Sequence, residues 1–72
     1  MKSMELLAAL RRSAESEEID ANGDTWGLVY LDNARPDDMR PRAFAGHLAA
    51  LKFSGLYRPY DHEAFGWVKV AS

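Results

Sequence analysis

Apolar residues recur at helical spacing near the start of the chain. They are Leu6, Leu7, Leu10 and Ala14. Ser3 precedes this stripe where a serine can cap a helix, and Glu5 lies in the first turn, where the helix dipole favours an acid. The pattern predicts a helix over residues 3–17. Because its apolar stripe is narrow, we expect this helix to cover a core rather than to form one.

A turn and then a strand are predicted in the next part of the chain. Residues 20–24 contain an Asn-Gly pair, which readily adopts positive φ, between carboxylates that can bond to the local backbone. The run 25–31 is rich in β-branched and aromatic residues, which favour a strand. Since apolar side chains fall on both faces of this run, we expect the strand to be covered from both sides.

A second helix is indicated by the clearest apolar stripe in the chain. Residues 36–40 form a polar connection with room for at most one short helical turn, and Pro41 suits the first position of a helix. Phe44, Leu48 and Leu51 then follow at positions i, i+4 and i+7. This spacing predicts a helix over residues 41–54.

The end of the second helix leads into a predicted hairpin. Gly55 is expected to take the left-handed conformation that stops a helix, which lets Leu56 fold back onto the helix. Short strands are predicted near residues 56–60 and 65–70, joined by the polar residues 61–64. Residues 1–72 are expected to form a single domain, because a chain of 72 residues has room for one.

The segment from Phe44 to Arg58 joins a stripe of paired leucines to a Gly-Leu helix exit. It resembles the recognition helix of winged helix-turn-helix domains, and the resemblance covers residues 42–70. It implies that residues 26–31 form the first small strand and residues 57–70 the wing hairpin. The implied fold is α+β and winged-helix-like, in the order helix, strand, short turn, helix, strand, strand, with a small antiparallel sheet. The implied function is that of a DNA-binding module, an accessory transcriptional regulator.

Charge is distributed unevenly along the chain, whose net charge is −2. Three bases and seven acids fall in residues 1–34, whereas six bases and four acids fall in residues 35–72. A basic second half suits a module that presents it to an anion such as duplex DNA. The candidate DNA-binding residues are Arg40, Arg42, Lys52, Arg58 and Lys69.

The outward face of the second helix favours a different partner. Base edges in DNA are contacted by long polar side chains, but opposite the Phe44 stripe this helix carries Arg42 and otherwise small or apolar residues. The candidate protein interface consists of Gly46, Ala49, Ala50 and Phe53. Two copies could pair there as a homodimer; alternatively, the first strand could cover this face within one chain. A non-enzymatic protein-interaction module or inhibitor is therefore the alternative function.

Four aromatic residues in and around the predicted hairpin have two interpretations. They are Tyr57, Tyr60, Phe65 and Trp67. Such rings can stack the bases of single-stranded nucleic acid, and in a small domain they also form the core and its rim.

No catalytic or metal-binding pattern is present in the sequence. There is no nucleophile elbow and no glycine-rich phosphate loop, so we do not expect an enzyme. His47 has no clustered partners, and residues 61–63 are neighbours on an extended chain whose side chains point apart. With no cysteine, the chain lacks thiolate ligands, and we expect neither a metal nor a cofactor. The first apolar run ends at Arg11, too early for a membrane span, so we expect a cytoplasmic protein without a membrane partner.

Overall fold

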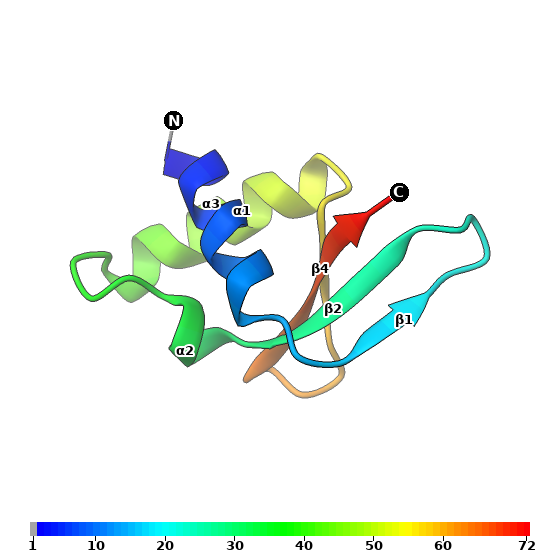
Figure 1. Cartoon of the computed structure of the whole chain (residues 1–72). Helices are drawn as coiled ribbons and strands as arrows, with labels where there is room; N and C mark the ends of the chain where they lie inside the picture. The colour runs from blue at the N-terminus through cyan, green and yellow to red at the C-terminus, as the bar shows by residue number, and fades with distance from the viewer. Residues whose placement is uncertain (1) are drawn as a thin grey trace.

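The computed structural model describes residues 2–72, and Figure 1 shows the order of its helices and strands. In chain order the elements are α1 (Lys2–Ser13), β1 (Glu17–Ile19), β2 (Thr25–Tyr30), α2 (Leu31–Ala34), α3 (Pro41–Phe53), β3 (Tyr57–Pro59) and β4 (Phe65–Ala71). The predicted α+β class and the small antiparallel sheet are confirmed. The predicted order of elements is incomplete, because it lacks the strand β1 and the one-turn helix α2.

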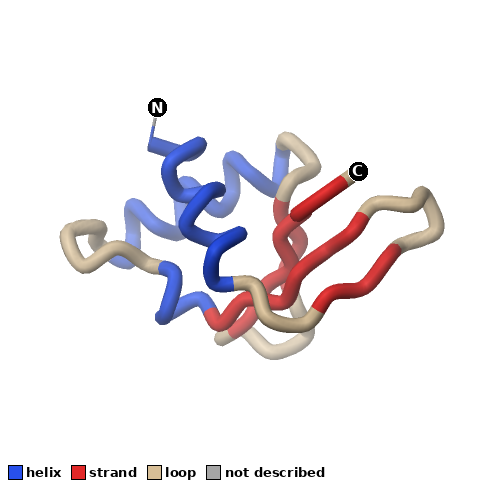
Figure 2. The backbone as a smooth tube through the Cα atoms, in the orientation of Figure 1, coloured by secondary structure: helices blue, strands red, loops and turns tan. Residues whose placement is uncertain are grey.

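The four strands form one antiparallel sheet in the order β1-β2-β4-β3 (Figure 2). At its centre β2 pairs with β4, which sets Leu28 opposite Trp67 and Val29 opposite Gly66. Side chains alternate between the two faces along a strand, and directly opposite residues share a face. One face of the sheet therefore carries Val29 and Val68, and the other carries Leu28 and Trp67.

Both long helices pack on the Val29 side of the sheet, so the molecule has two layers (Figure 1). The buried core between the layers consists of Leu6, Leu7, Leu10, Val29, Ala34, Phe44, Leu51, Tyr57 and Val68. The apolar stripe predicted for α3 is thereby confirmed as core. The expectation that the first helix covers the core without forming it is wrong, because Leu6, Leu7 and Leu10 are fully part of it. No helix in residues 2–72 is long and apolar enough to span a membrane.

The prediction that the first strand is covered from both sides is wrong. Within residues 2–72 the helices cover only the Val29 face, and Leu28 and Tyr30 lie half-buried on the opposite face. The apolar side chains on that second face pack against one another and against side chains of β4 instead of beneath a second layer. We call this uncovered surface the open sheet face.

The first helix ends earlier than predicted, at Ser13 rather than at residue 17. The chain then turns along β2: the Glu15 amide donates to the Leu28 carbonyl at 3.0 Å, and the Leu28 amide donates to the Ser16 carbonyl at 2.8 Å. Gly27 permits this approach, because a Cβ on it would meet the Ala14 side chain at 2.5 Å. Pairing with β2 thus outweighs the helical preference of residues 14–17 and creates β1.

The remaining boundaries differ from the predicted ones by a few residues. Leu31, predicted as the last residue of a strand, begins α2, and residues 36–40 contain a turn but no helix. The predicted stop of α3 is confirmed: Gly55 has a φ of 78°, and the Leu56 amide donates to the Leu51 carbonyl at 2.9 Å. This reversal of the chain after Gly55 places Tyr57 in the core.

A substitution at Gly66 tests how tightly the Tyr57 ring packs on the sheet. A Cβ at this position would overlap the ring and hydroxyl of Tyr57. We expect Gly66→Ala to lower the free energy of unfolding by about 1–3 kcal/mol, the range for overpacking a core, as measured by urea titration.

The matched control is Gly46→Ala in α3, where nothing lies within 4 Å of the added Cβ. Because alanine is the better helix former, this variant should be more stable than the parent by about 1 kcal/mol. If the two substitutions changed stability in the same direction, the Tyr57–Gly66 contact would not limit the packing.

Candidate functional site

The outward face of α3 is the most exposed apolar surface in residues 2–72. Phe53 is 95% exposed, and Gly46, Ala49 and Ala50 are also exposed. Phe44 and Leu51 point the other way, into the core. The alternative that a strand covers this face within one chain is wrong, because β2 lies in the sheet on the inner side of the helix. The candidate protein interface is therefore accessible in a single molecule.

The charges along α3 have one sign. Arg42 lies at its start and Lys52 in its last turn, and the helix contains no acid. His47 is half-buried, and its Nδ1 lies 2.8 Å from the Ser3 Oγ of α1. Ser3 was expected to cap α1, but it lies within that helix and joins it to α3 instead. The outward face of α3 thus combines small and apolar residues with two bases, Arg42 near its start and Lys52 next to Phe53 at its end.

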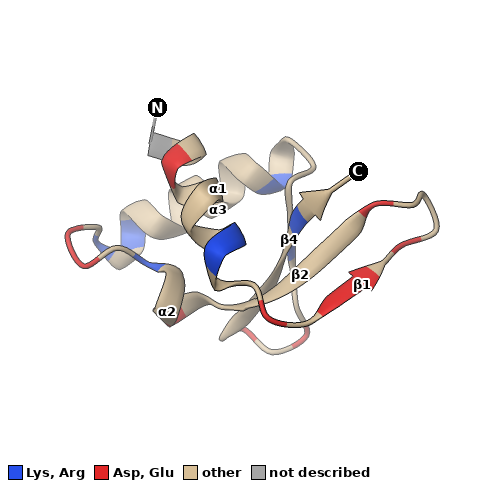
Figure 3. Ribbon diagram, viewed as in Figure 1, with Lys and Arg blue, Asp and Glu red and all other residues tan. Residues whose placement is uncertain are grey.

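The five candidate DNA-binding residues do not form one patch, as the separated basic regions in Figure 3 indicate. Arg40 and Arg42 lie at the start of α3, and Lys52 lies about 15 Å along the helix, given a rise of about 1.5 Å per residue. Arg58 and Lys69 lie in β3 and β4. The two arginines of α3 border a surface hollow of about 550 Å³, which also contains Asp38, Met39, Ala43 and His47.

Arg58 and Lys69 are engaged with Trp26 on the open sheet face. The guanidinium carbon of Arg58 lies 4.1 Å from the centre of the indole, and the Lys69 Nζ lies 5.6 Å from it. These contacts explain why Trp26 is only 4% exposed although no helix covers it. Cation–π contacts of this kind contribute about 0.5–2 kcal/mol each, so the two bases hold the indole in place.

Two carboxylates from the β1–β2 turn complete this cluster. Asp24 Oδ2 lies 3.3 Å from the Lys69 Nζ, and Asp20 Oδ2 lies 3.6 Å from Nη2 of Arg58. Asp20 Oδ2 also accepts a hydrogen bond from the Trp26 indole N–H at 2.8 Å. Both bases therefore already have acidic partners, which makes them poor candidates for phosphate contacts.

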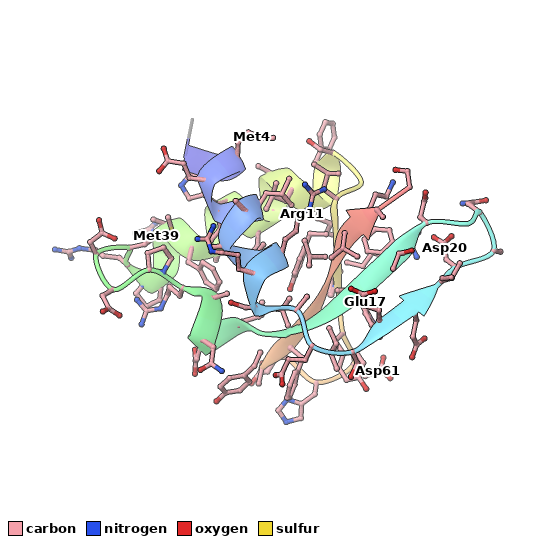
Figure 4. All side chains as sticks on the ribbon, viewed as in Figure 1. Met4, Arg11, Glu17, Asp20, Met39 and Asp61 are labelled. Carbon is pink, nitrogen blue, oxygen red and sulfur yellow. The ribbon has the colours of Figure 1, made fainter. Side chains whose placement is uncertain are left out.

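Asp20 also organises the turn in which it lies (Figure 4). Its Oδ1 accepts hydrogen bonds from the backbone amides of Asn22 at 2.8 Å and Asp24 at 3.0 Å. The hydrogen bond from Trp26, followed by these amides and the charge of Arg58, lowers the pKa of Asp20 below its ordinary value of 3.8. The sequence interpretation recognised the turn but missed its link to Trp26. The available signal was an Asp-x-Asn-Gly turn followed closely by a tryptophan.

The rest of the open sheet face is an aromatic cluster. Ring centres are 5.3 Å apart for Tyr30 and Phe65, 6.0 Å for Tyr60 and Phe65, and 5.7 Å for Tyr60 and Trp67. Of the four predicted stacking residues, Tyr57 instead lies in the core, where burial raises its pKa above the ordinary 10.0. Tyr60, Phe65 and Trp67 are on the surface, but each ring packs against a neighbouring ring at a steep angle.

A hollow of about 160 Å³ opens on this face between β1 and β3. It is lined by Glu18, Ile19, Asp20, Trp26, Arg58 and Trp67. Glu18 is opposite Trp26 in the sheet and so faces the same side, whereas the neighbouring Ile19 is opposite Thr25 and is 73% exposed. The hollow thus combines the Trp67 indole and the Arg58 side chain over Trp26 with an acidic border. Among residues 2–72 there is no group of three His, Asp or Glu side chains that could hold a metal ion.

Comparisons with known proteins found no relative of this chain. No family model matches it, and no curated protein or solved structure matches it. The resemblance to winged helix-turn-helix domains therefore stays a prediction.

The pKa of Asp20 leads to a pH-dependent stability. Because this pKa is lower in the folded protein than in the unfolded chain, the carboxylate stabilises the fold above about pH 4, the ordinary range for an aspartate. This stabilisation should be lost as the pH falls through the folded-state pKa. We expect the urea midpoint of the parent to fall between pH 5 and pH 2 more steeply than that of Asp20→Asn, since the amide cannot ionise.

Asp61→Asn is the control, because Asp61 is an exposed loop residue outside the cluster. Its urea midpoint should follow that of the parent at every pH. Parallel pH profiles for the parent and Asp20→Asn would contradict a special role for this carboxylate.

Proposed function

We propose that this protein is a non-enzymatic protein-interaction module that binds its partner through the outward face of α3. The observation that carries the proposal is the nearly complete exposure of Phe53 beside Gly46, Ala49 and Ala50. A contiguous apolar surface of this kind, bordered by charges, is typical of protein contact sites. A cysteine-free chain suits the reducing cytoplasm, where we propose that the module works.

The energetics of this face support a contact rather than a solvated surface. Covering a phenylalanine side chain contributes about 1.5–3 kcal/mol, which is enough for one residue to dominate a small interface. Gly46 and Ala49 carry almost no side chain, so the backbone of a partner can come close to the helix. Arg42 and Lys52 would attract an acidic partner and orient its approach.

A second copy of the chain is one candidate partner, since two α3 helices can approach at Gly46 and Ala49 with each Phe53 beside the other molecule. The module is thus proposed to act as a homodimer or in a complex with another protein.

Duplex DNA is the second candidate partner, with the winged-helix resemblance and the start of α3 in its favour. Arg40 and Arg42 border the same hollow, and both are exposed, so they can contact phosphates together. Lys52 is also exposed and provides a third basic contact on the same helix. The apolar surface between these bases offers little to base edges, so we rank this function second.

Phe53 is the residue that tests the protein-interaction function. A photo-crosslinking phenylalanine analogue at position 53 should capture a partner, and the same analogue at Met4, which is 56% exposed on α1, should not. The identified partner, once purified, should bind Phe53→Ala about 10- to 30-fold more weakly than the parent in calorimetric titrations, as expected for an interface anchor. Equal capture at the two positions, or unchanged affinity for Phe53→Ala, would refute the proposal.

A salt titration tests the second candidate. If α3 binds duplex DNA, removing the charge in Arg42→Ala should weaken binding and reduce the slope of log affinity against log salt by about 1. Fluorescence anisotropy with a labelled duplex at low salt measures both quantities. Arg12→Ala, which removes an exposed base on α1, is the control and should leave the slope unchanged. Absence of binding at micromolar protein would exclude duplex DNA as a partner.

A further inference from the structure

Two uncovered surfaces of this molecule have opposite charge. The outward face of α3 carries Arg42 and Lys52 and no acid. The open sheet face is bordered by acids: Glu18 on β1 at one side, and Asp61 and Glu63 in the loop between β3 and β4. The His62 ring of this loop packs 5.9 Å from Phe65, which places the loop at the aromatic end of the face.

The bases of the open sheet face do not cancel these acids. Arg58 is paired with Asp20 and Lys69 with Asp24, so each base is already neutralised. Within the described chain, residues 2–72, no base forms an ion pair with Glu18, Asp61 or Glu63. The border of the open sheet face therefore keeps a negative charge, which is complementary to α3.

The size of the hollow on the open sheet face also matches α3. Its volume is about 160 Å³. An apolar cavity of about 150 Å³ is large enough to hold a benzene ring. The hollow is lined by the indole of Trp67 and by the Arg58 side chain that covers the Trp26 ring, and Glu18 and Asp20 lie at its border. The Phe53 ring has the right size for the hollow. The neighbouring Lys52 carries the charge that is complementary to Glu18 at the border of the hollow.

We propose that α3 of one molecule docks on the open sheet face of a second copy, with Phe53 seated in the hollow against Trp67 and the Arg58 side chain that covers Trp26. This inference rests on the proposed function of α3 and names its partner. A two-fold pair of α3 helices would bring Arg42 and Lys52 of both copies together without an acid. Docking on the open sheet face instead sets them against an acidic border. Charge thus favours the head-to-tail arrangement.

The head-to-tail contact uses two different surfaces of each molecule. After two molecules have joined, one α3 and one open sheet face remain free, so further copies can add in a ring or a chain. This property separates the proposal from a two-fold dimer, in which both equivalent surfaces are consumed. Two variants that each lose one surface make the difference measurable.

Sedimentation velocity from about 1 μM to 1 mM covers the range of weak specific contacts. Phe53→Ser removes the ring from α3. Glu18→Lys/Ile19→Lys reverses the charge at the border of the hollow and makes the same edge strand basic, while α3 stays intact. All three side chains are exposed, so both variants should keep the urea midpoint of the parent. We expect the parent to associate as its concentration rises, and each variant alone to associate at least about 10-fold more weakly. Met4→Ser removes an exposed apolar side chain elsewhere and should behave like the parent.

An equimolar mixture of the two variants gives the deciding result. Phe53→Ser supplies an intact open sheet face and Glu18→Lys/Ile19→Lys an intact α3, so we expect a species of two chains and nothing larger. If Glu18→Lys/Ile19→Lys associates as strongly as the parent, and mixing restores nothing, the two copies meet through α3 alone and the proposal is overturned.

A measurement on the parent needs no variant. On dilution, the NMR signals of the Trp26 and Trp67 indole N–H groups should shift together with those of the Phe53 ring, and a shift confined to α3 would contradict the proposal. A parent that stays monomeric up to about 1 mM would also overturn it. The proposed function would survive that result if another protein still binds in a Phe53-dependent way.

Discussion

The pairing of β2 with β4 is the interaction on which the rest of this structure depends. It joins Thr25–Tyr30 to Phe65–Ala71, so it closes the long stretch of chain that contains α2, α3 and β3. On one side it sets Val29 and Val68 beneath the two long helices. On the other side the same ladder brings Leu28 beside Trp67 and Tyr30 beside Phe65, and this creates the open sheet face. The register between β2 and β4 therefore determines both which side chains form the core and which form the open sheet face.

Ion pairs within the molecule determine which charged side chains can still contact a partner. Asp20 and Asp24 hold Arg58 and Lys69 over Trp26, so two of the bases in the basic second half act within the molecule. The bases of α3 have no acid on their own helix and stay directed outward. The small net charge thus conceals a separation between a basic helix face and an acidic sheet border. Such a separation favours protein contacts with complementary charge over binding to a uniformly negative polymer.

Local patterns in the sequence were sufficient for α3 and insufficient for β1. The stripe of Phe44, Leu48 and Leu51, together with Gly55, determines where α3 begins, which side it buries and where it stops, and its exposed face follows from the same periodicity. Glu17-Glu18-Ile19 has no such pattern, because this strand exists only through its pairing with β2. The open sheet face could not be predicted for a related reason. The alternation of residues shows that both sides of a strand are apolar, but it does not show whether the chain supplies a second layer to cover them. The ion pairs of Arg58 and Lys69 join segments that are distant in the sequence. The sequence therefore identified the two basic residues but not their pairing with Asp20 and Asp24.

The short strand β1 has a consequence for the solubility of the protein. Without it, the backbone groups of β2 would form an open edge on a strand rich in Trp, Leu, Val and Tyr, which is the composition that recruits further strands. β1 occupies this edge with three residues and ends the sheet with two glutamates, Glu17 and Glu18. A new strand arriving at the outer edge of β1 meets like charges and too few hydrogen-bonding groups to hold it. The short acidic strand therefore disfavours the addition of further strands at this edge of the sheet.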